Sequence, residues 1–340
     1  MDGLRVALIG YGGAGRGIHA RLIRAAGQQV VAVVTASRAA AVHADWPDAC
    51  VLPDVETLLA DVTDVDLVVV ASPTGAHATH TATALATGVH VIVDKPLATT
   101  EAEAAELVAR GDGRLTVFQN RRWDAEQLAL LDLLARGELG RVHRFERRWE
   151  RFRPRPQDRW KENDEQAGGL LLDLGAHLVD SAVQLFGPVL EVYAELAART
   201  TPAVDDVFLA VRHETGVLSH LQAGGLVAAP GPRTRVLGER GAYLVTRFEG
   251  EPTPFEAFDD AYEESRRPGE PVHEGWLVRG AERTPVPAPG GGHHEIYPAL
   301  RAWVRGEGPV PVDPADAVAT ARVLDAARRS AHEHQVVPLT

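Results

Sequence analysis

A glycine-rich turn near the start of the chain places the tightest constraint on the fold. Gly10, Gly12 and Gly15 follow the β-branched run Arg5 to Ile9 and open the Ala-rich stretch Ala14 to Ala25. Between a strand and a helix, the first glycine makes the turn, the second lets the backbone approach a pyrophosphate, and the third permits close packing. Amides at the helix start bind phosphate. The turn could exist without a ligand, but its position predicts a dinucleotide site at Gly10, Tyr11, Gly12, Gly13, Ala14 and Gly15.

The first 120 residues alternate short β-branched runs with Ala-rich stretches. This pattern is typical of a parallel sheet with crossover helices. The predicted strands are Arg5 to Ile9, Gln29 to Val34, Cys50 to Leu52, Leu67 to Ala71, Val89 to Val93 and Leu115 to Phe118. The predicted helices are Ala14 to Ala25, Arg38 to Ala44, Val55 to Leu59, Ala76 to Ala86 and Glu101 to Arg110. The fold class is therefore α/β, with a Rossmann domain of doubly wound parallel sheet over residues 1–120.

A different pattern follows and predicts a second domain, of α+β type, over residues 121–340. Its predicted helices are Asp124 to Arg136, Leu170 to Phe186, Glu295 to Val304 and Pro314 to His332. Strand-like segments separated by short turns favour a large, mostly antiparallel sheet; they are Val189 to Arg199, Val207 to His213, Val217 to Ala223, Arg233 to Leu237 and Ala242 to Phe248. The Pro- and Gly-rich stretch from Glu249 to Gly292 is interpreted as an irregular connection.

A sheet of this size with helices on one face leaves the other face available for a second subunit. We therefore expect a homo-oligomer, either a homodimer or a homotetramer.

A net charge of −12 argues against a nucleic-acid partner, because binding to phosphates needs a positive surface. Eight arginines between Arg141 and Arg159 raise the alternative of an RNA-binding surface. Aromatic and charged residues alternate there with a period of two, and Glu146 and Glu150 interrupt the positive charge. This favours a long strand with one packed face.

Compartment and membrane contact follow from what the sequence lacks. No apolar run reaches the roughly 18 residues that cross a bilayer, and Met1 is followed almost directly by the first strand, so neither a membrane segment nor a signal peptide is expected. The single cysteine, Cys50, excludes an internal disulfide and Cys-based metal clusters. We expect a cytoplasmic protein in which Cys50 contributes to packing.

The end of the second strand bears on the choice of dinucleotide. An NAD enzyme usually places a carboxylate there for the ribose 2′-hydroxyl. This chain instead has Ser37, which can donate a hydrogen bond, and Arg38, which can pair with a 2′-phosphate. NADP is favoured over NAD, although Arg38 could equally be a solvated residue of the first helical turn.

Three motifs resemble, in order and spacing, the Gfo/Idh/MocA oxidoreductase family: the glycine turn, Ala71-Ser72-Pro73-Thr74-x-x-His77, and Val93-Asp94-Lys95-Pro96-Leu97. Further segments resemble the branch of NADP-dependent scyllo-inositol dehydrogenases; these are residues 120–124, 158–160 and 168–177. Asp94 and Thr74 depart from the commonest pattern, which has Glu and Asn. The resemblance implies hydride transfer on a sugar or polyol. It adds, as cofactor contacts, Ser72, Pro73, Thr74, His77, Asp94, Lys95, Arg122 and Trp160.

Oxidation of an alcohol needs a base for the hydroxyl proton. Lys95 ends a strand at the edge where open α/β sheets bind ligands, and burial would lower its pKa. Asp173 and His177 are four residues apart on one face of a predicted helix. We assign His177 as acid/base on the strength of its near-neutral titration, Lys95 as the group that polarises the reacting oxygen, and Asp173 as a group that binds a substrate hydroxyl or orients the site. Without the resemblance, a solvated lysine and a helical Asp–His hydrogen bond would be the default interpretation.

Weaker candidates remain. The resemblance also implies that Trp123, with Arg122 and Trp160, contacts the cofactor or closes the pocket, although each could instead pack the domain interface. Tyr297 is a weaker candidate for contact with a substrate hydroxyl. His293 and His294 are interpreted as surface or loop residues. Asp180 could in principle complete a metal site with Asp173 and His177, but no metal is expected.

The leading hypothesis is an NADP-dependent dehydrogenase or reductase that acts on a sugar, an inositol-like polyol or a related ketone. One alternative is a non-catalytic regulator that binds dinucleotide. Another is a sugar–sugar oxidoreductase that keeps NADP bound. The substrate's identity and stereochemistry, the physiological direction, and closure of the loop from Glu249 to Gly292 over the substrate stay open at this point.

Overall fold

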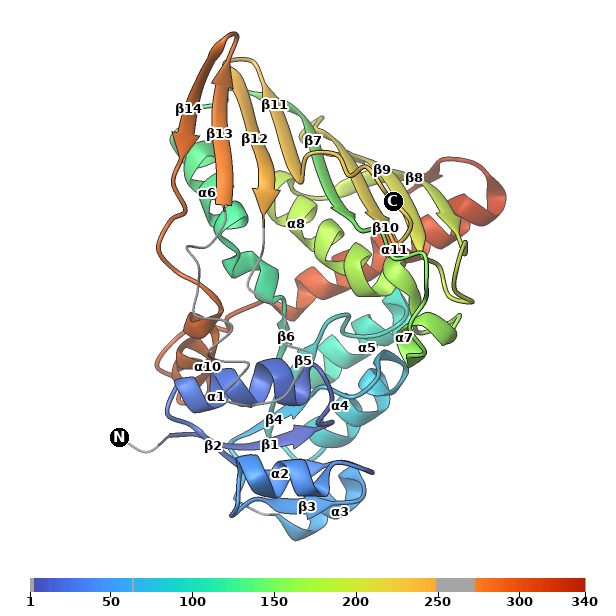
Figure 1. The fold of residues 1–340 in the computed structure, drawn as a ribbon. Coiled ribbons are helices and arrows are strands. Elements are labelled where there is room, and N and C mark those ends of the chain that lie inside the picture. The colour runs from blue at the N-terminus through green and yellow to red at the C-terminus, as the bar shows by residue number, and fades with distance from the viewer. Residues whose placement is uncertain (1–2, 63, 249–272, 340) are drawn as a thin grey trace.

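The computed structural model describes residues 3–62, 64–248 and 273–339. Two sheets lie at opposite ends of the molecule with helices between them (Figure 1). Within these ranges, no helix is long and apolar enough to cross a membrane.

The first sheet has six parallel strands in the order β3-β2-β1-β4-β5-β6, which confirms the predicted Rossmann fold. Its strands are β1 Arg5–Ile9, β2 Gln29–Val34, β3 Cys50–Leu52, β4 Leu67–Val70, β5 His90–Asp94 and β6 Leu115–Phe118. Every residue of β4 and β6 is buried because helices cover both faces of the sheet. These helices include α1 Ala20–Ala25, α2 Ala39–Asp45, α3 Val55–Asp61, α4 His77–Leu85 and α5 Glu101–Gly111.

The second sheet has nine strands in the order β14-β13-β12-β11-β7-β10-β9-β8-β15. They are β7 Val142–Glu150, β8 Val189–Ala197, β9 Asp206–His213, β10 Leu218–Gly224, β11 Thr234–Gly238, β12 Gly241–Phe248, β13 His273–Arg279, β14 Glu282–Val286 and β15 Val337–Pro338. Neighbouring strands are antiparallel except for β7 and β10, which run parallel. The predicted large, mostly antiparallel sheet is therefore confirmed.

The prediction of an irregular connection from Glu249 to Gly292 is wrong in its second half. Strands β13 and β14 form a hairpin there, turning at Gly280, which has a positive φ of 62°. Pro285 is tolerated because β14 is an edge strand, where a missing amide breaks no central ladder. Residues 249–272 lie outside the described residues.

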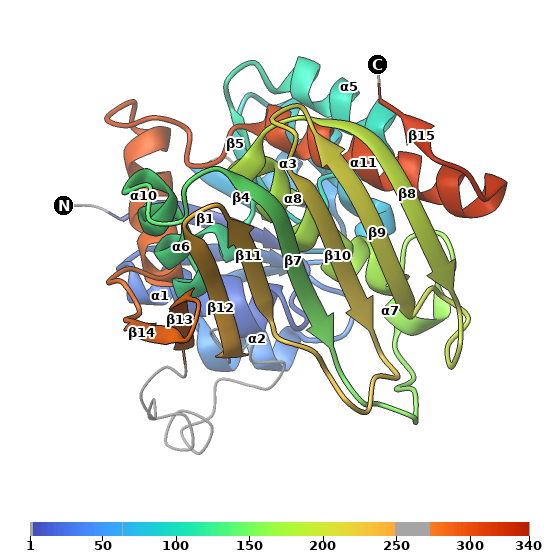
Figure 2. The ribbon, with the colours of Figure 1, turned by 90° about the horizontal axis from the view of Figure 1, so that it is seen from above.

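One face of the second sheet is packed and the other is open. The helices of this half are α6 Ala125–Ala135, α7 Trp160–Asn163, α8 Ala176–Phe186, α10 Ile296–Val304 and α11 Pro314–Glu333. Helices α6, α8 and α11 share a hydrophobic core with the inward-facing strand residues. Figure 2 looks onto the outward face, which no helix of the described chain covers.

The last helices return to the first sheet. Ile296, Leu300 and Trp303 of α10 pack into a Rossmann core cluster. The N-terminal half of α11 packs against the other face of the same sheet, and its C-terminal half packs in the second core. The chain therefore passes between the two halves three times, after β6, before α10 and along α11.

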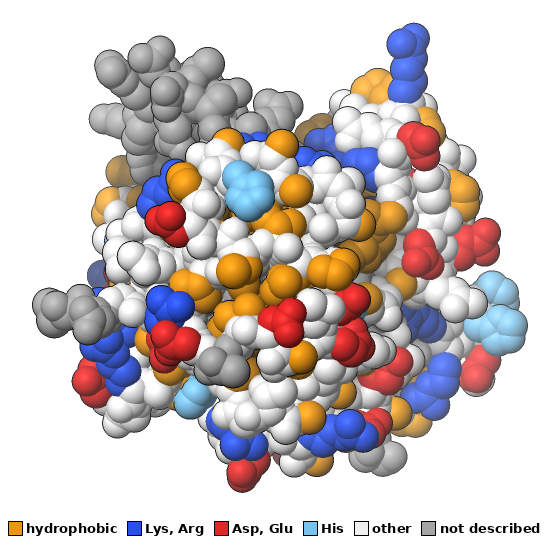
Figure 3. Space-filling model, turned by 90° about the horizontal axis from the view of Figure 1, so that it is seen from below, with side chains coloured by type: hydrophobic (Ala, Val, Ile, Leu, Met, Phe, Trp, Pro, Cys, Tyr) orange, Lys and Arg blue, Asp and Glu red, His pale blue; other side chains and the backbone are white. Residues whose placement is uncertain are grey.

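The first half of the arginine-rich segment forms β7, as its alternation predicts, and Phe145 on the inner face of this strand is fully buried. The second half, from Arg151 to Arg159, lies beyond the strand. Arg147 is also buried, and it donates to Gln127 and to the hydroxyl of Thr234. On the Rossmann side, Figure 3 shows Lys and Arg scattered among Asp and Glu around hydrophobic side chains. Cys50 corrects the packing prediction, because it is exposed on the edge strand β3.

Candidate active site

The glycine turn has the geometry that each of its glycines was predicted to need. Gly10 has a φ of 99°, and its amide donates to the Val34 carbonyl at 2.9 Å. A Cβ on Gly15 would lie 2.0 Å from the Gly10 carbonyl oxygen, so only glycine lets the helix start this close to β1. A Cβ on Gly12 would meet nothing within 4 Å. Gly12 therefore faces open space, as a residue that lies against a pyrophosphate should.

A cleft of about 880 Å³ begins at this turn and runs between the two domains. Gly15, Arg122 and Trp123 do not line it, but the other residues predicted to bind the cofactor or to act in catalysis do. The predicted residues that line it are Gly10, Tyr11, Gly12, Gly13, Ala14, Ser37, Arg38, Ser72, Pro73, Thr74, His77, Asp94, Lys95, Trp160, Asp173 and His177. The size of the cleft and its open glycine wall fit a dinucleotide.

The part of the cleft beside the end of β2 is where the adenosine ribose of a bound dinucleotide would lie. Ser37 and Arg38 line the cleft there, and both are exposed to solvent. Asp54 and Glu56 also line it, but the Asp54 carboxylate caps α3 by accepting from the Thr57 amide at 2.7 Å. The end of β2 itself presents no carboxylate.

At the other end of the cleft, Lys95 and Asp173 form an ion pair across the domain boundary. The Lys95 Nζ lies 2.9 Å from Asp173 Oδ1 and 2.5 Å from the Asp173 carbonyl oxygen. Lys161 lies in the first turn of the short helix α7, directly after Trp160. Its Nζ lies 2.7 Å from the same Oδ1. One carboxylate therefore binds two ammonium groups.

The charges in this cluster set its protonation. Burial raises the pKa of Asp173, but Lys95 and Lys161 outweigh it and hold that pKa well below its usual range. Burial lowers the pKa of Lys95, as predicted, while Asp173 opposes the decrease. Asp173 consequently stays ionised and orients the lysines, which supports the second of its two predicted roles.

His177 lies one helical turn beyond Asp173, where a π-helical turn, Leu171–Gly175, leads into α8. Its side chain is buried beside Trp149, with ring centroids 6.0 Å apart. Its Nδ1 has no hydrogen-bond partner among the described residues. Burial, together with nearby Lys95 and Arg121, lowers its pKa well below the usual value. The expected near-neutral titration is therefore wrong; at neutral pH the imidazole is uncharged and able to accept a proton.

His77 connects two of the predicted motifs. Its Nδ1 lies 2.7 Å from the Pro96 carbonyl oxygen, and its Nε2 lies 2.9 Å from the Ser72 carbonyl oxygen. The imidazole thus bridges the turn after β4 and the turn that follows Lys95. In the second turn, the Asp94 carboxylate accepts a hydrogen bond from the Lys95 amide at 2.9 Å.

Arg122 is a correction to the predicted cofactor contacts, because it does not line the cleft. Its guanidinium pairs with Asp180 at 2.6 Å and with Asp316 at 2.9 Å, and so links the segment after β6 to α8 and α11. The adjacent Arg121 lines the cleft instead. Trp123 packs against a Rossmann core cluster.

Two further side chains lie elsewhere than expected. Tyr297 is fully buried, and its hydroxyl lies 2.8 Å from His19 Nδ1, so it belongs to the Rossmann core and not to a substrate site. His293 is buried rather than on the surface, with its Nε2 2.9 Å from Asp124. Across the described ranges, no group of three His, Cys, Asp or Glu residues could hold a metal ion.

Lys161 is the functional residue that sequence reasoning missed, although a signal was present. The chain has 35 basic residues but only two lysines, Lys95 and Lys161, and both contact Asp173. Arginine supplies the other 33 of the 35 basic residues, so both compact ammonium groups of the chain meet at one carboxylate.

Two family models match the chain. Residues 4–119 match an oxidoreductase family with an NAD-binding Rossmann fold, and residues 128–244 match the GFO/IDH/MocA C-terminal domain. The uncharacterized oxidoreductase YdgJ of Escherichia coli is 35% identical over 339 residues, which cover 97% of each chain. The scyllo-inositol 2-dehydrogenase (NADP(+)) IolW of Bacillus subtilis is 28% identical over 347 residues, which cover 100% of this chain and 97% of that protein.

The similarity extends to solved structures. The structure of yvaA from Bacillus subtilis superposes with a TM-score of 0.88 at 29% identity and covers 100% of this chain and 99% of its own. An oxidoreductase structure from Yersinia pestis gives a TM-score of 0.86 at 31% identity, with 100% and 98% covered.

Proposed function

Because this chain belongs to the Gfo/Idh/MocA family of oxidoreductases, we propose that it transfers hydride between NADP and a carbinol carbon of a sugar, an inositol-like polyol or the related ketone. The observation that carries this proposal is the cluster of Lys95, Lys161 and Asp173 beside His177, at the opposite end of one cleft from the glycine turn. The bound nicotinamide would supply the hydride acceptor or donor. A protein that only bound dinucleotide would have no need for this cluster.

Lys95 is the residue that holds the reacting oxygen. Its ammonium is fixed by the Asp173 carboxylate and carbonyl, and one of its three N–H groups remains for a substrate hydroxyl. A positive charge at this point stabilises negative charge that develops on the oxygen as the hydroxyl proton leaves. Asp173 acts through the two lysines and is a positioning residue.

His177 accepts and returns the proton. Its lowered pKa keeps the imidazole neutral at physiological pH, which is the state that can take a proton from an alcohol. Burial next to Trp149 restricts the ring, so its orientation is set before substrate binds.

NADP is preferred over NAD in this proposal because of Ser37 and Arg38. Both line the ribose end of the cleft, and the end of β2 has no carboxylate to repel a 2′-phosphate. The NADP-dependent relative IolW is consistent with this choice.

A spectrophotometric screen of polyols, sugars and keto sugars with NADP(H) and NAD(H) tests the proposed function. We expect turnover in the wild type and its loss in Lys95→Ala and His177→Ala, with NADPH binding retained. His143→Ala, at an exposed position near the start of β7, is the control and should keep full activity. Absence of turnover across the whole screen, or wild-type rates in both cleft variants, would reject the proposal.

We also propose that the outward face of the second sheet joins subunits into a homodimer or homotetramer. The exposed Leu218 lies on this face, beside Arg144 on β7 and opposite Arg212 on β9. Sedimentation velocity should report a dimer or larger assembly that Leu218→Asp weakens, whereas Val336→Asp, at an exposed site outside the central strands, leaves it intact. A monomeric wild type would contradict this proposal. A cytoplasmic location stays a prediction.

A further inference from the structure

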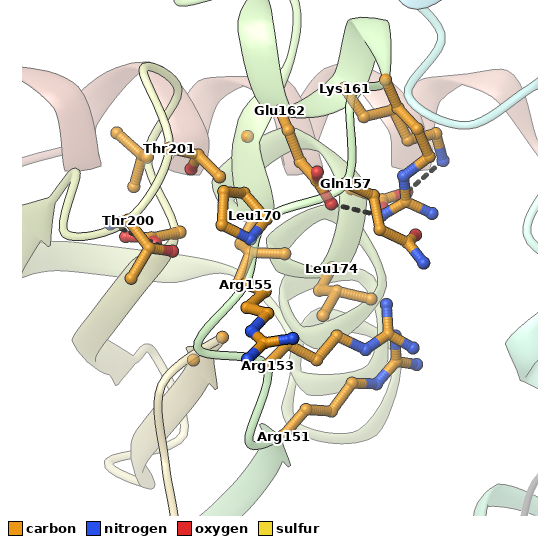
Figure 4. Close-up of a pocket in the computed structure, with 18 residues that line it drawn as sticks. Arg151, Arg153, Arg155, Gln157, Lys161, Glu162, Leu170, Leu174, Thr200 and Thr201 are labelled. Carbon is orange, nitrogen blue, oxygen red and sulfur yellow. Dashed lines mark hydrogen bonds and ion pairs between the residues drawn. The ribbon is translucent and has the colours of Figure 1, made fainter.

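A second hollow, of about 90 Å³, opens beside the Lys95–Asp173 pair. Five basic side chains line it, four of them arginines from the segment that follows β7; they are Arg151, Arg153, Arg155, Arg159 and Lys161. Figure 4 shows Arg151, Arg153 and Arg155 projecting from this segment, with Thr200 and Thr201 on the other side of the hollow. We call this space the arginine hollow. It is large enough to hold several water molecules and therefore a small polyatomic anion.

The arginine hollow is continuous with the catalytic end of the cleft. Six residues line both spaces, namely Arg151, Arg159, Lys161, Gly169, Asp173 and Leu174. None of the glycine-turn residues lines the arginine hollow. A molecule whose carbinol lies at Lys95 can therefore extend into the arginine hollow, while the dinucleotide occupies the other arm of the cleft.

Among the described residues, the acidic side chains of the arginine hollow form an ion pair with only one of its four arginines, Arg159. Asp173 is bound to the two lysines, and Glu162 pairs with Arg159. Asp205 accepts from the Arg199 amide at 2.6 Å and from the Thr200 amide at 2.8 Å. Within the described ranges, no carboxylate forms an ion pair with Arg151, Arg153 or Arg155.

The remaining donors of the arginine hollow are largely used. The Thr200 hydroxyl donates to Asp205, and the Thr201 hydroxyl donates to the Ala203 carbonyl. Among the described residues, the side-chain donors that remain are the Gln157 amide and the guanidinium groups of Arg151, Arg153 and Arg155. Burial, and then Arg153, lowers the pKa of Arg151 to about 10, while Asp173 opposes the decrease. Such a cluster is unusual in a chain with a net charge of −12.

We propose that the physiological substrate is an anionic sugar or polyol, whose phosphate or carboxylate is bound by Arg151, Arg153 and Arg155. Guanidinium groups form paired hydrogen bonds with both anions, and removal of the unbalanced positive charge favours their binding. The inference rests on the proposed function and adds the substrate's charge to it. The anion anchors one end of the substrate, and the carbinol lies at Lys95 and His177.

Binding and turnover are to be measured side by side on NADP-loaded protein. Isothermal titration calorimetry and kcat/KM would compare inositol, an inositol monophosphate, glucose and glucuronate. We expect the phosphate or the carboxylate to improve affinity about 10- to 100-fold over the neutral parent, as a charge-assisted contact does. The comparison of inositol monophosphate with glucuronate distinguishes the two anions.

The double variant Arg153→Ala/Arg155→Ala should remove most of that difference in affinity. The matched control is Arg141→Ala, from the same basic segment, whose guanidinium is solvent-exposed and paired with Glu239. Equal affinity for neutral and anionic ligands in the wild type, or an unchanged difference in the double variant, would overturn the inference. So would a double variant that alters only the sedimentation coefficient, because the arginines would then pair with a second subunit.

Calorimetry separates this inference from the proposed function. Arginine-dependent binding of an anionic sugar without turnover of any compound would count against hydride transfer but leave the ligand class standing. Turnover of neutral polyols without any anion preference would support hydride transfer and reject the arginine hollow as a substrate site.

Discussion

Lys161 Nζ and Asp173 Oδ1 lie 2.7 Å apart, and this is the same carboxylate oxygen that Lys95 reaches at 2.9 Å. Burial lowers the pKa of Lys161, but Asp173 outweighs it and raises that pKa overall. The carboxylate therefore raises the pKa of both amines, enough to outweigh burial at Lys161 but not at Lys95.

Asp173→Asn should lower kcat by about 100-fold or more, because an acid–base apparatus loses this much when its groups are misplaced. The loss of the negative charge also lowers the pKa of both lysines, so the pH limb that reports Lys95 should move to lower pH. A pH profile of kcat/KM, with Asp132→Asn on the exposed side of α6 as control, measures both effects. A lower rate with an unshifted profile would mean that Asp173 acts only through structure.

Gly12→Ala and Gly15→Ala form a matched pair. An added Cβ at Gly12 meets open space, so we expect an unchanged melting temperature without cofactor and a strongly weakened affinity for NADPH. The Cβ at Gly15 collides with the Gly10 carbonyl, so this variant should lose about 3 kcal/mol of folding free energy or more. Thermal unfolding with and without NADPH distinguishes the two variants. If NADPH stabilised the Gly12→Ala protein as much as the wild type, the prediction that the pyrophosphate lies against Gly12 would be wrong.

Arg38→Ala should weaken NADPH binding about 10- to 100-fold while leaving NADH binding nearly unchanged, because only the former has a 2′-phosphate to pair with. Arg110→Ala, on the exposed side of α5, controls for the loss of a surface charge. Fluorescence titration of both dinucleotides gives the ratio. Equal losses for the two would remove the physical basis for NADP preference.

Arg122→Ala should destabilise the protein by about 3 kcal/mol, since it leaves the buried Asp180 carboxylate without its cation. Asp316 is half-exposed, so Asp316→Ala should cost much less. Urea unfolding measures both free energies. If Arg122→Ala instead weakened NADPH binding at full stability, the interpretation of Arg122 as an interdomain anchor would be wrong.

The sequence predicts the Rossmann half well because its strands are apolar runs that end at turn residues. The starts of β1, β2, β3, β4 and β6 fall where the β-branched runs begin, and the glycine turn has the geometry that its spacing requires. Period-two alternation likewise predicts β7.

The sequence does not predict which way neighbouring side chains point, or which segments far apart in the chain come into contact. Arg121 and Arg122 are neighbours in a single helical turn, and only the packed structure shows that the first faces the cleft and the second faces α8. Burial of Tyr297 depends on α10 returning to the first sheet, where its hydroxyl meets His19, 278 residues away in the chain. His293 is buried against Asp124, which is 169 residues away. The hairpin of β13 and β14 is not predicted from the sequence, because prolines and glycines usually indicate irregular structure. Here Pro285 lies in an edge strand and Gly280 in the turn.

Helix α11 connects the two halves of the molecule because it is packed into the hydrophobic cores of both. Ala317 and Ala321 are buried in the Rossmann core, while Leu324 and Ala327 of the same helix are buried in the core of the second sheet. A hinge between the domains would have to break the backbone hydrogen bonds of this helix or extract one of its ends from a core. This shared helix therefore resists rotation of the domains, and we expect substrate exchange to proceed through movements of side chains and loops at the mouth of the cleft.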